Sequence, residues 1–191
     1  MPKTGMEPLR RAALVDAAII EIGAARSLDV TVAQIARRAG MSSGLAHHYF
    51  GGKDQMLLAA MKQILSEFSQ KMCAGLQHAK TPRERLEAVV HANFADHVFD
   101  RSKTSAWLSF YGLAQSNDQA AYLMRIYQRR LRSNLLFDLK TLTPRADEIA
   151  AALGALIDGV YLRAALTGTG PDPKASETVL MTLNALLGDT Q

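Results

Sequence analysis

Two groups of residues in this 191-residue chain have types and spacings that could do chemistry. In the first, short polar side chains and two histidines lie between Thr31 and Lys53, where they could donate hydrogen bonds to phosphates and base edges. The second surrounds Asp158, which interrupts an apolar run from Ile149 to Ile157. A carboxylate in apolar surroundings needs a positive partner, either a basic side chain or a cationic ligand.

The first group has the pattern of a helix-turn-helix over residues 32–49. Ala36 is small enough for two helices to approach each other, and Gly40 can adopt the positive φ of a tight turn between them. A helical hairpin that only packs as core is the alternative interpretation. His47 and His48 could also be metal ligands, but neighbours on a helix point about 100° apart, which disfavours a metal site.

The second group could form an aromatic cavity around a cation. Trp107 and Tyr111 are spaced i, i+4, and Asp158 and Tyr161 are spaced i, i+3, so each pair shares a helical face. A quaternary ammonium cannot donate a hydrogen bond, and it is held by aromatic faces at about 0.5–2 kcal/mol per face. Ordinary core packing of the aromatics remains open. For Asp158 the structural alternative is an ion pair with Arg125, Arg129 or Arg163.

Helices must position both groups, because helix signals recur along the chain and strand-like alternation does not persist. Capping boxes begin at Thr31 and Thr81, and a long periodic stretch covers residues 53–78. Further expected caps are Ser42, Ser102, Asn117, Thr143 and Asp172. We expect an all-α protein of about nine helices, with a three-helix unit (residues 1–52) feeding into a six-helix bundle (residues 53–191).

Composition excludes several classes of protein. The chain is 48% hydrophobic and 21% charged, as in soluble globular proteins. Residues 1–62 hold eight basic and five acidic side chains, so most of the net charge of +4 lies where an anionic partner would bind. Cys73 is the only cysteine, which excludes an intrachain disulfide. No secretory signal or apolar run of about 20 residues is present, so we expect a cytoplasmic protein with no membrane partner.

Catalytic motifs are absent from the sequence. It contains no Gly-rich phosphate loop, no G-x-S-x-G and no H-E-x-x-H. Glu87 and His91 are spaced i, i+4, but the E-x-x-H pairs of a di-iron bundle are missing. We therefore expect neither an enzyme nor a cofactor.

The segments Thr31–Gly40 and Ser42–Phe50, followed by Lys53, resemble the DNA-binding domain of the TetR family of repressors. The resemblance covers about residues 8–60 and rests on the aromatic end of the recognition helix and the lysine after it. It implies an Ω-shaped homodimer that binds a palindromic operator in double-stranded DNA. A small molecule entering the C-terminal bundle would release the operator.

By that resemblance, several residues fall at DNA-contacting positions. Those expected on the DNA backbone are Thr31, His48, Tyr49 and Lys53, with Gln34 beside them at the start of the same helix as Thr31. Those expected near bases are Ser42, Ser43, Gly44, Leu45 and His47. Position 47 is often tyrosine in the family, which leaves the contact of this histidine open. A basic tail containing Lys3, Arg10 and Arg11 is expected to reach the neighbouring minor groove.

Within the family, the chain is similar to choline-responsive repressors of glycine-betaine synthesis, through segments such as Ala106–Phe110, Arg129–Leu135 and Ala155–Gly159. That similarity implies choline as the inducer. The residues expected around it are Phe94, Trp107, Tyr111, Tyr127, Asp158 and Tyr161. The alternative is a TetR-type repressor with a different inducer, either apolar or a cationic drug.

The last two expected helices could form the homodimer interface. The first has small residues over much of its surface: Ala150, Ala151, Gly154, Ala155 and Gly159. The second has an apolar stripe made by Val179, Leu180, Leu183, Leu186 and Leu187. Packing inside one subunit is the alternative.

Overall fold

The computed structural model describes residues 5–95, 99–167, 172 and 174–188. Within these ranges it contains nine helices and no strand, which confirms the all-α prediction. The helices are α1 (Met6–Ala25), α2 (Val32–Arg38), α3 (Ser43–Phe50), α4 (Lys53–His78), α5 (Pro82–Asn93), α6 (Arg101–Ser116), α7 (Asp118–Leu142), α8 (Ala146–Thr167) and α9 (Ala175–Leu187).

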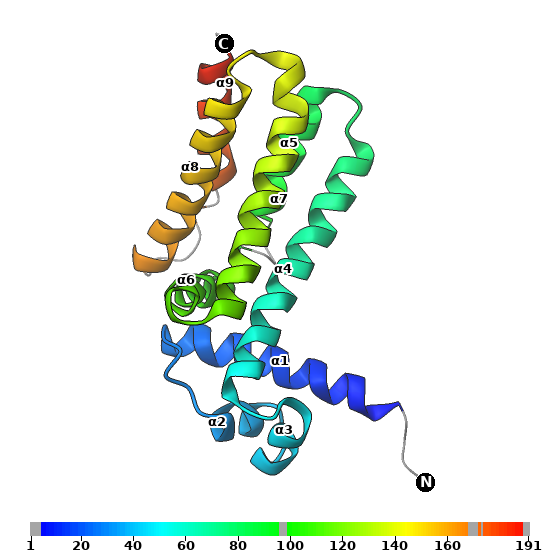
Figure 1. The fold of residues 1–191 in the computed structure, drawn as a ribbon, viewed down its shortest axis with the longest axis vertical. Helices are drawn as coiled ribbons and strands as arrows, with labels where there is room; N and C mark the ends of the chain where they lie inside the picture. Colours follow the sequence, from blue (N-terminus) through cyan, green and yellow to red (C-terminus); the bar gives the residue numbers. More distant parts are fainter. Residues whose placement is uncertain (1–4, 96–98, 168–171, 173, 189–191) are drawn as a thin grey trace.

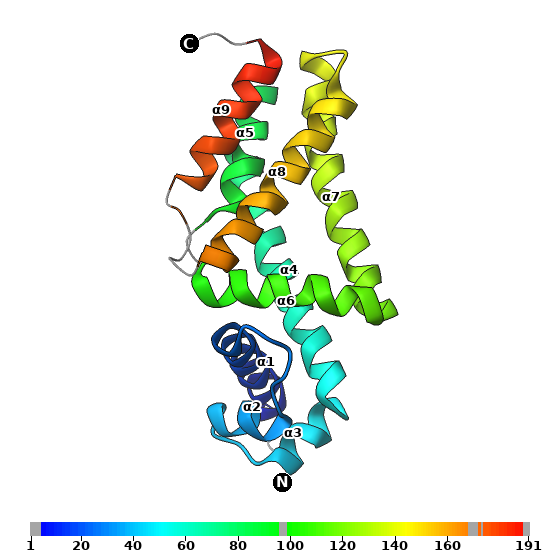
Figure 2. The same cartoon turned by 90° about the vertical axis from the view of Figure 1, so that its left-hand side faces the viewer.

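The helices form a small head and a larger body (Figure 1). Helices α1, α2 and α3 make the head, and α4 runs from the head into the body beside α7. Helix α6 lies across the base of the body, directly over α1 (Figure 2). The head therefore meets the body mainly through α4 and through the contact between α6 and α1.

Local capping explains most of the helix starts. Thr31 and Thr81 both begin capping boxes, and Ser42 and Asn117 accept hydrogen bonds from the first turns of α3 and α7, all as predicted. The remaining caps differ from prediction. Asp100 replaces Ser102 as the cap of α6, since its carboxylate accepts the Lys103 N–H at 2.9 Å. Thr143 ends α7 and Asp172 accepts the Lys174 N–H, so α8 and α9 begin later than expected, at Ala146 and Ala175.

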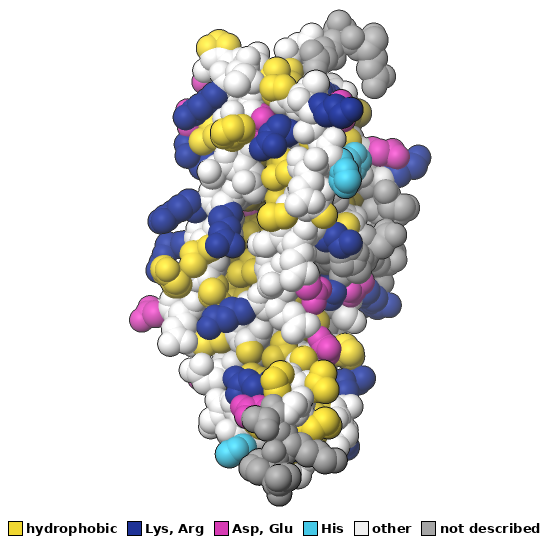
Figure 3. Space-filling model, turned by 90° about the vertical axis from the view of Figure 1, so that its right-hand side faces the viewer, with side chains coloured by type: hydrophobic (Ala, Val, Ile, Leu, Met, Phe, Trp, Pro, Cys, Tyr) yellow, Lys and Arg dark blue, Asp and Glu magenta, His cyan; other side chains and the backbone are white. Residues whose placement is uncertain are grey.

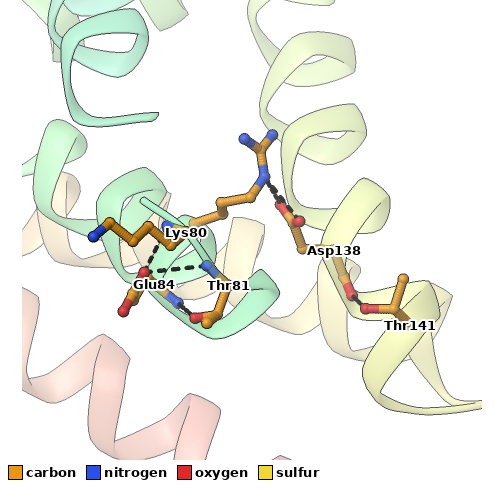
Figure 4. A network of polar contacts seen from close by, with 6 residues as sticks. Lys80, Thr81, Glu84, Asp138 and Thr141 are labelled. Atoms are coloured by element: carbon orange, nitrogen blue, oxygen red, sulfur yellow. Dashed lines mark hydrogen bonds and ion pairs between the residues drawn. The ribbon is translucent and has the colours of Figure 1, made fainter. Parts of the chain in front are cut away.

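An ion pair between a half-buried arginine and a buried carboxylate joins α5 to α7 (Figure 4). The Arg85 Nε donates to both carboxylate oxygens of Asp138, at 2.9 and 3.1 Å. Asp138 is 2% exposed, so the guanidinium supplies the charge that a buried carboxylate requires. In the same view Glu84 accepts the N–H groups of Lys80 and Thr81 and so completes the start of α5.

Helix α8 is long and apolar enough, by length and composition alone, to cross a membrane. Its most apolar 18-residue window has a mean hydropathy of 1.6, and 33% of that window is buried. In the structure α8 packs against α6, α7 and α9 as a bundle helix. The packing leaves apolar surface on α8 uncovered.

The head and the body meet at a direct backbone contact between α1 and α6. A Cβ atom added at Gly23 would lie 2.5 Å from the carbonyl oxygen of Ser102 and 2.6 Å from its Cα. These atoms are backbone and cannot turn aside as a flexible side chain could. Gly23 therefore allows an approach that any other residue would prevent.

Substituting Gly23→Ala should lower the free energy of unfolding by about 1–3 kcal/mol, because the added methyl group forces α1 away from α6. The matched control is Gly112→Ala in α6, where an added Cβ meets nothing within 4 Å. The control should raise stability by about 0.5–1 kcal/mol, the usual gain of alanine over glycine inside a helix. Denaturant unfolding of both variants measures the difference, and equal effects would show that the close approach is unimportant.

Candidate functional site

The start of α2 holds two of the predicted DNA-contacting residues in a closed hydrogen-bond pattern. The Thr31 Oγ1 accepts the Gln34 N–H at 3.2 Å, and the Gln34 Oε1 accepts the Thr31 N–H at 2.7 Å. Both residues are exposed. This geometry fixes the amide-rich end of α2 at the surface, where its positive partial charge could face a phosphate.

Helix α3 presents a polar face to solvent. Ser43, Gly44, His47 and His48 are exposed, as the sequence predicts. Ser42 is exposed as well, and its hydroxyl accepts the N–H of Leu45 at 3.2 Å. The opposite face is anchored by Ala46 and Phe50, which are buried. Leu45 and Tyr49 are half-buried at the boundary between the two faces.

Lys53 is the first residue of α4 and lies three residues after the end of α3. It is half-buried and makes no hydrogen bond or ion pair with another residue in the described part of the chain. A cation at a helix N-terminus opposes the helix dipole, by typically 0.3–1 kcal/mol. A phosphate at this position would offset that cost.

Arg11 does not belong to a basic tail, which corrects the sequence prediction. It lies within α1, donates a hydrogen bond to the Tyr49 carbonyl, and its guanidinium carbon lies 4.5 Å from the centre of the Phe50 ring. Arg11 therefore anchors the end of α3 to α1. Arg10 is exposed on the same helix, and Lys3 lies outside the described residues.

In the body, aromatic side chains gather between α4, α6, α7 and α8. We call this cluster the aromatic box; it consists of Phe68, Phe94, Phe99, Trp107, Tyr111, Tyr127 and Tyr161. The Trp107 ring centre lies 5.0 Å from that of Tyr127 and 5.9 Å from that of Tyr111. Phe94 stacks on Tyr161 at 5.8 Å. The five predicted aromatics thus fall into two groups of touching rings, one around Trp107 and one around Tyr161, which meet because both residues line one cavity. The structure adds Phe68 to the first group and Phe99 to the second, and the sequence analysis missed both.

Asp158 joins the aromatic box through a hydrogen bond, with its Oδ1 accepting from the Tyr127 hydroxyl at 3.2 Å. Among the described residues no lysine, arginine or histidine forms an ion pair with it, so the predicted arginine partners are not used. The Tyr111 hydroxyl is buried and, within the described chain, has no hydrogen-bond partner. The carboxylate therefore faces phenol groups rather than a cation.

Burial disfavours the charged form of each acid in this cluster. Desolvation raises the pKa of Asp158, and the nearby hydroxyls of Tyr111 and Tyr127 oppose that rise only in part. Burial and then the charge of Asp158 raise the pKa of Tyr127 and of Tyr111. Burial also raises the pKa of Tyr161. A cation placed in this box would stabilise the ionised Asp158 that burial disfavours.

Two hollows meet at the aromatic box. The inner cavity has a volume of about 20 Å³, room for roughly one water molecule, and Phe68, Trp107, Tyr127 and Tyr161 are among the residues that line it. Of the predicted ligand residues in the described chain, Phe94, Tyr111 and Asp158 do not line it. The outer hollow is a groove of about 300 Å³ between α4 and α7. Figure 3 shows hydrophobic side chains exposed on this side of the molecule, with Lys and Arg side chains around them.

Metal binding has no support in the described residues, which contain no group of three or more His, Cys, Asp or Glu side chains able to hold an ion. His47 and His48 are both exposed on α3 without a third ligand beside them in that part of the chain. The two candidate sites are therefore the exposed head and the aromatic box.

Two family models match the sequence. Residues 11–60 match the model for bacterial regulatory proteins of the tetR family. Residues 82–188 match the model for the C-terminal domain of BetI-type transcriptional repressors.

Known proteins resemble the chain over most of its length. The HTH-type transcriptional regulator BetI of Brucella melitensis is 53% identical over 174 residues, which cover 90% of this chain and 88% of the relative. The BetI regulator of Agrobacterium fabrum is 49% identical over 168 residues, covering 87% and 82%. A putative transcriptional regulator from Saccharomonospora viridis, solved in complex with choline, has a TM-score of 0.79 at 24% identity and covers 93% of this chain and 95% of its own. A putative regulator from Pseudomonas aeruginosa has a TM-score of 0.79 at 23% identity, covering 95% and 91%.

Proposed function

The chain belongs to the TetR family of transcriptional regulators, with a BetI-type C-terminal domain, and from this premise we propose that it represses genes of glycine-betaine synthesis and releases their operator when choline binds. Residues 1–52 would bind DNA, and residues 53–191 would bind the inducer and the second subunit. Such a repressor acts in the cytoplasm, where its operator lies. The observation that carries the choline assignment is Asp158, a half-buried carboxylate among aromatic rings that lacks a basic partner among the described residues.

Choline suits the aromatic box because its charge cannot be satisfied by hydrogen bonds. The ammonium group is covered by methyl groups, so aromatic faces and a carboxylate are its natural partners. Trp107, Tyr127 and Asp158 supply both kinds of group within one cluster. The choline complex of the Saccharomonospora viridis protein, which shares this fold, agrees with the assignment. An apolar inducer would leave the half-buried Asp158 carboxylate uncompensated.

Binding would require the aromatic box to open, because the inner cavity of about 20 Å³ is far smaller than choline. The rings that must separate are carried by helices that reach the head: Phe68 lies on α4 and Trp107 on α6. A coupling free energy of about 1–3 kcal/mol between the two sites would weaken operator binding 5- to 150-fold.

In the head, α3 would enter the major groove of each operator half-site. Ser43, Gly44 and His47 are exposed there and could reach base edges. Lys53 and the start of α2 would contact phosphates on either side. Two subunits reading two half-sites explain why a palindromic operator is expected.

TetR-family regulators form dimers, and we propose that α8 and α9 build the interface in this chain. Leu162, Leu166 and Met181 are 45%, 67% and 64% exposed, although all three are large and apolar. A second copy of α8 and α9 would cover them. The predicted stripe on α9 is partly wrong, because Val179 and Leu183 are fully buried within their own subunit.

Substituting Lys53→Ala should weaken binding to all duplex sequences alike and lower the slope of log K against log salt by about one, as for a lost phosphate contact. Lys71→Ala is the matched control, because Lys71 is exposed on the same helix about 27 Å further along it. The control should leave the slope unchanged. Fluorescence anisotropy over a salt series measures both, and an unchanged slope for Lys53→Ala would exclude its phosphate contact.

Substituting Ala155→Glu should dissociate the dimer and abolish operator binding, because it places a charge on the exposed face of α8. Ala74→Glu is the control, since Ala74 is exposed on α4, away from α8. Analytical ultracentrifugation at micromolar concentration reports the oligomeric state of each. A wild-type monomer under these conditions would refute the proposed interface.

Substituting Asp158→Asn should remove most of the choline affinity, measured by calorimetry, and leave operator binding intact. Because burial raises the pKa of Asp158, the wild-type protein loses stability as pH rises through that raised pKa. The ligand-free variant should therefore be more stable than wild type at neutral pH. Asp147→Asn should change neither property, because Asp147 is an exposed carboxylate of α8, the helix of Asp158, and pairs with Arg132 of α7.

Two outcomes for Asp158→Asn would count against choline sensing through this residue. One is an unfolded protein, and the other is a protein that no longer binds the operator although its choline affinity is unchanged. Either would identify Asp158 as a structural group of the bundle.

A further inference from the structure

The groove between α4 and α7 adjoins the aromatic box. Leu65, Phe68 and Tyr127 line both the inner cavity and the groove, so a single layer of side chains separates the two spaces. The groove has a volume of about 300 Å³, compared with about 20 Å³ for the inner cavity. A ligand whose head enters the box could therefore extend into the groove.

The groove extends away from the box along both helices. Helices α4 and α7 run side by side in the same direction (Figure 1). On α7 the groove is lined in turn by Tyr127, Arg130 and Asn134, at spacings i, i+3 and i+7 on one face. Arg130 lies about 4.5 Å further along the axis of α7 than Tyr127 does. Arg130 is thus the first charged group that a ligand would meet beyond the box.

Arg130 supplies a positive charge that has no partner in the described structure. It is exposed, and it forms no ion pair or hydrogen bond with any described residue. The described residues that line the groove include no Asp or Glu, and most of them are apolar, such as Leu65, Met72 and Ile126. The groove is therefore electrostatically suited to an anion.

We propose that this site accepts choline esterified through its hydroxyl to a small anionic group, with the ammonium in the aromatic box and the anion on Arg130. The inference rests on the proposed function, since it assumes that the box holds a quaternary ammonium. Phosphocholine is the simplest member of this class, because only a short ethyl bridge separates its nitrogen from its phosphate ester. Choline alone would leave the groove and Arg130 unoccupied.

A carboxylate with an apolar tail is the competing occupant of the groove. It would satisfy Arg130 and the apolar wall, but it would leave Asp158 and the rings around it without a cation. Because Phe68 and Tyr127 belong to both spaces, opening the box for an ammonium also opens the way into the groove. A zwitterionic ligand would pair with both Asp158 and Arg130.

The test compares the affinities of choline, acetylcholine and phosphocholine for the full-length protein. Acetylcholine extends choline by an uncharged ester, so it controls for length. Phosphocholine should bind about 5- to 10-fold more tightly than acetylcholine, as expected for a charge-assisted contact near the surface. Arg130→Gln should remove that preference and leave choline affinity unchanged. Arg129→Gln, which alters the neighbouring exposed arginine outside the groove, should keep the preference.

Cys73 provides a second readout, because it is the only cysteine of the chain and lines the groove. Saturating phosphocholine should slow its alkylation by a maleimide several-fold more than saturating choline does. Equal protection by the two ligands, or equal affinity for phosphocholine and acetylcholine, would overturn the inference.

The same experiment separates this inference from the proposed function. If choline binds and releases the operator, but the protein does not bind phosphocholine more tightly than acetylcholine, only the inference on the groove fails. If none of the three ammonium compounds binds while a fatty acid protects Cys73, the choline assignment and the inference both fail.

Discussion

The contact between Gly23 and Ser102 determines how the head is attached to the body. With no side chain between the two backbones, α6 cannot shift or tilt without moving α1. Helix α1 in turn holds the end of α3, because Arg11 donates to the Tyr49 carbonyl and lies over the Phe50 ring. The orientation of α3, the proposed DNA-reading helix, is therefore tied to the position of α6. The opposite face of α6 carries Trp107, a wall of the aromatic box.

Two links thus connect the proposed inducer site with the head. Helix α4 is the first link: it begins at Lys53 and carries Phe68 into the aromatic box. At 26 residues it spans about 39 Å and can act as a rigid lever. The second link runs through α6 and α1. An inducer that separates Phe68 from Trp107 would move both helices at once, so the spacing of the two heads in a dimer would change by a concerted shift.

The sequence predicted those features that depend on neighbouring residues. The capping boxes at Thr31 and Thr81 and the full extent of α4 were correct because caps and apolar periodicity are local. The contacts it missed join distant parts of the chain. Arg11 and Tyr49 are 38 residues apart, and nothing in the segment around Arg11 distinguishes an anchor from a flexible arm. Phe68 and Phe99 likewise read as ordinary core residues, because their place in the aromatic box depends on how α4 and α6 pack.

Asp138 and Asp158 show what distinguishes a structural carboxylate from one available to a ligand. Both lie on long helices of the body; Asp138 is buried and Asp158 is half-buried. Asp138 has the guanidinium of Arg85 at hydrogen-bonding distance, so its charge is already compensated and a ligand would gain nothing from it. Asp158 has only the Tyr127 hydroxyl as a hydrogen-bond donor in the described chain. Selection for stability alone would place an arginine beside Asp158 or replace Asp158 with a neutral residue. An uncompensated carboxylate among aromatic rings instead makes the ligand-free protein less stable than it could be. A cation that enters the aromatic box would compensate this charge, and the stability gained would contribute to the free energy of binding.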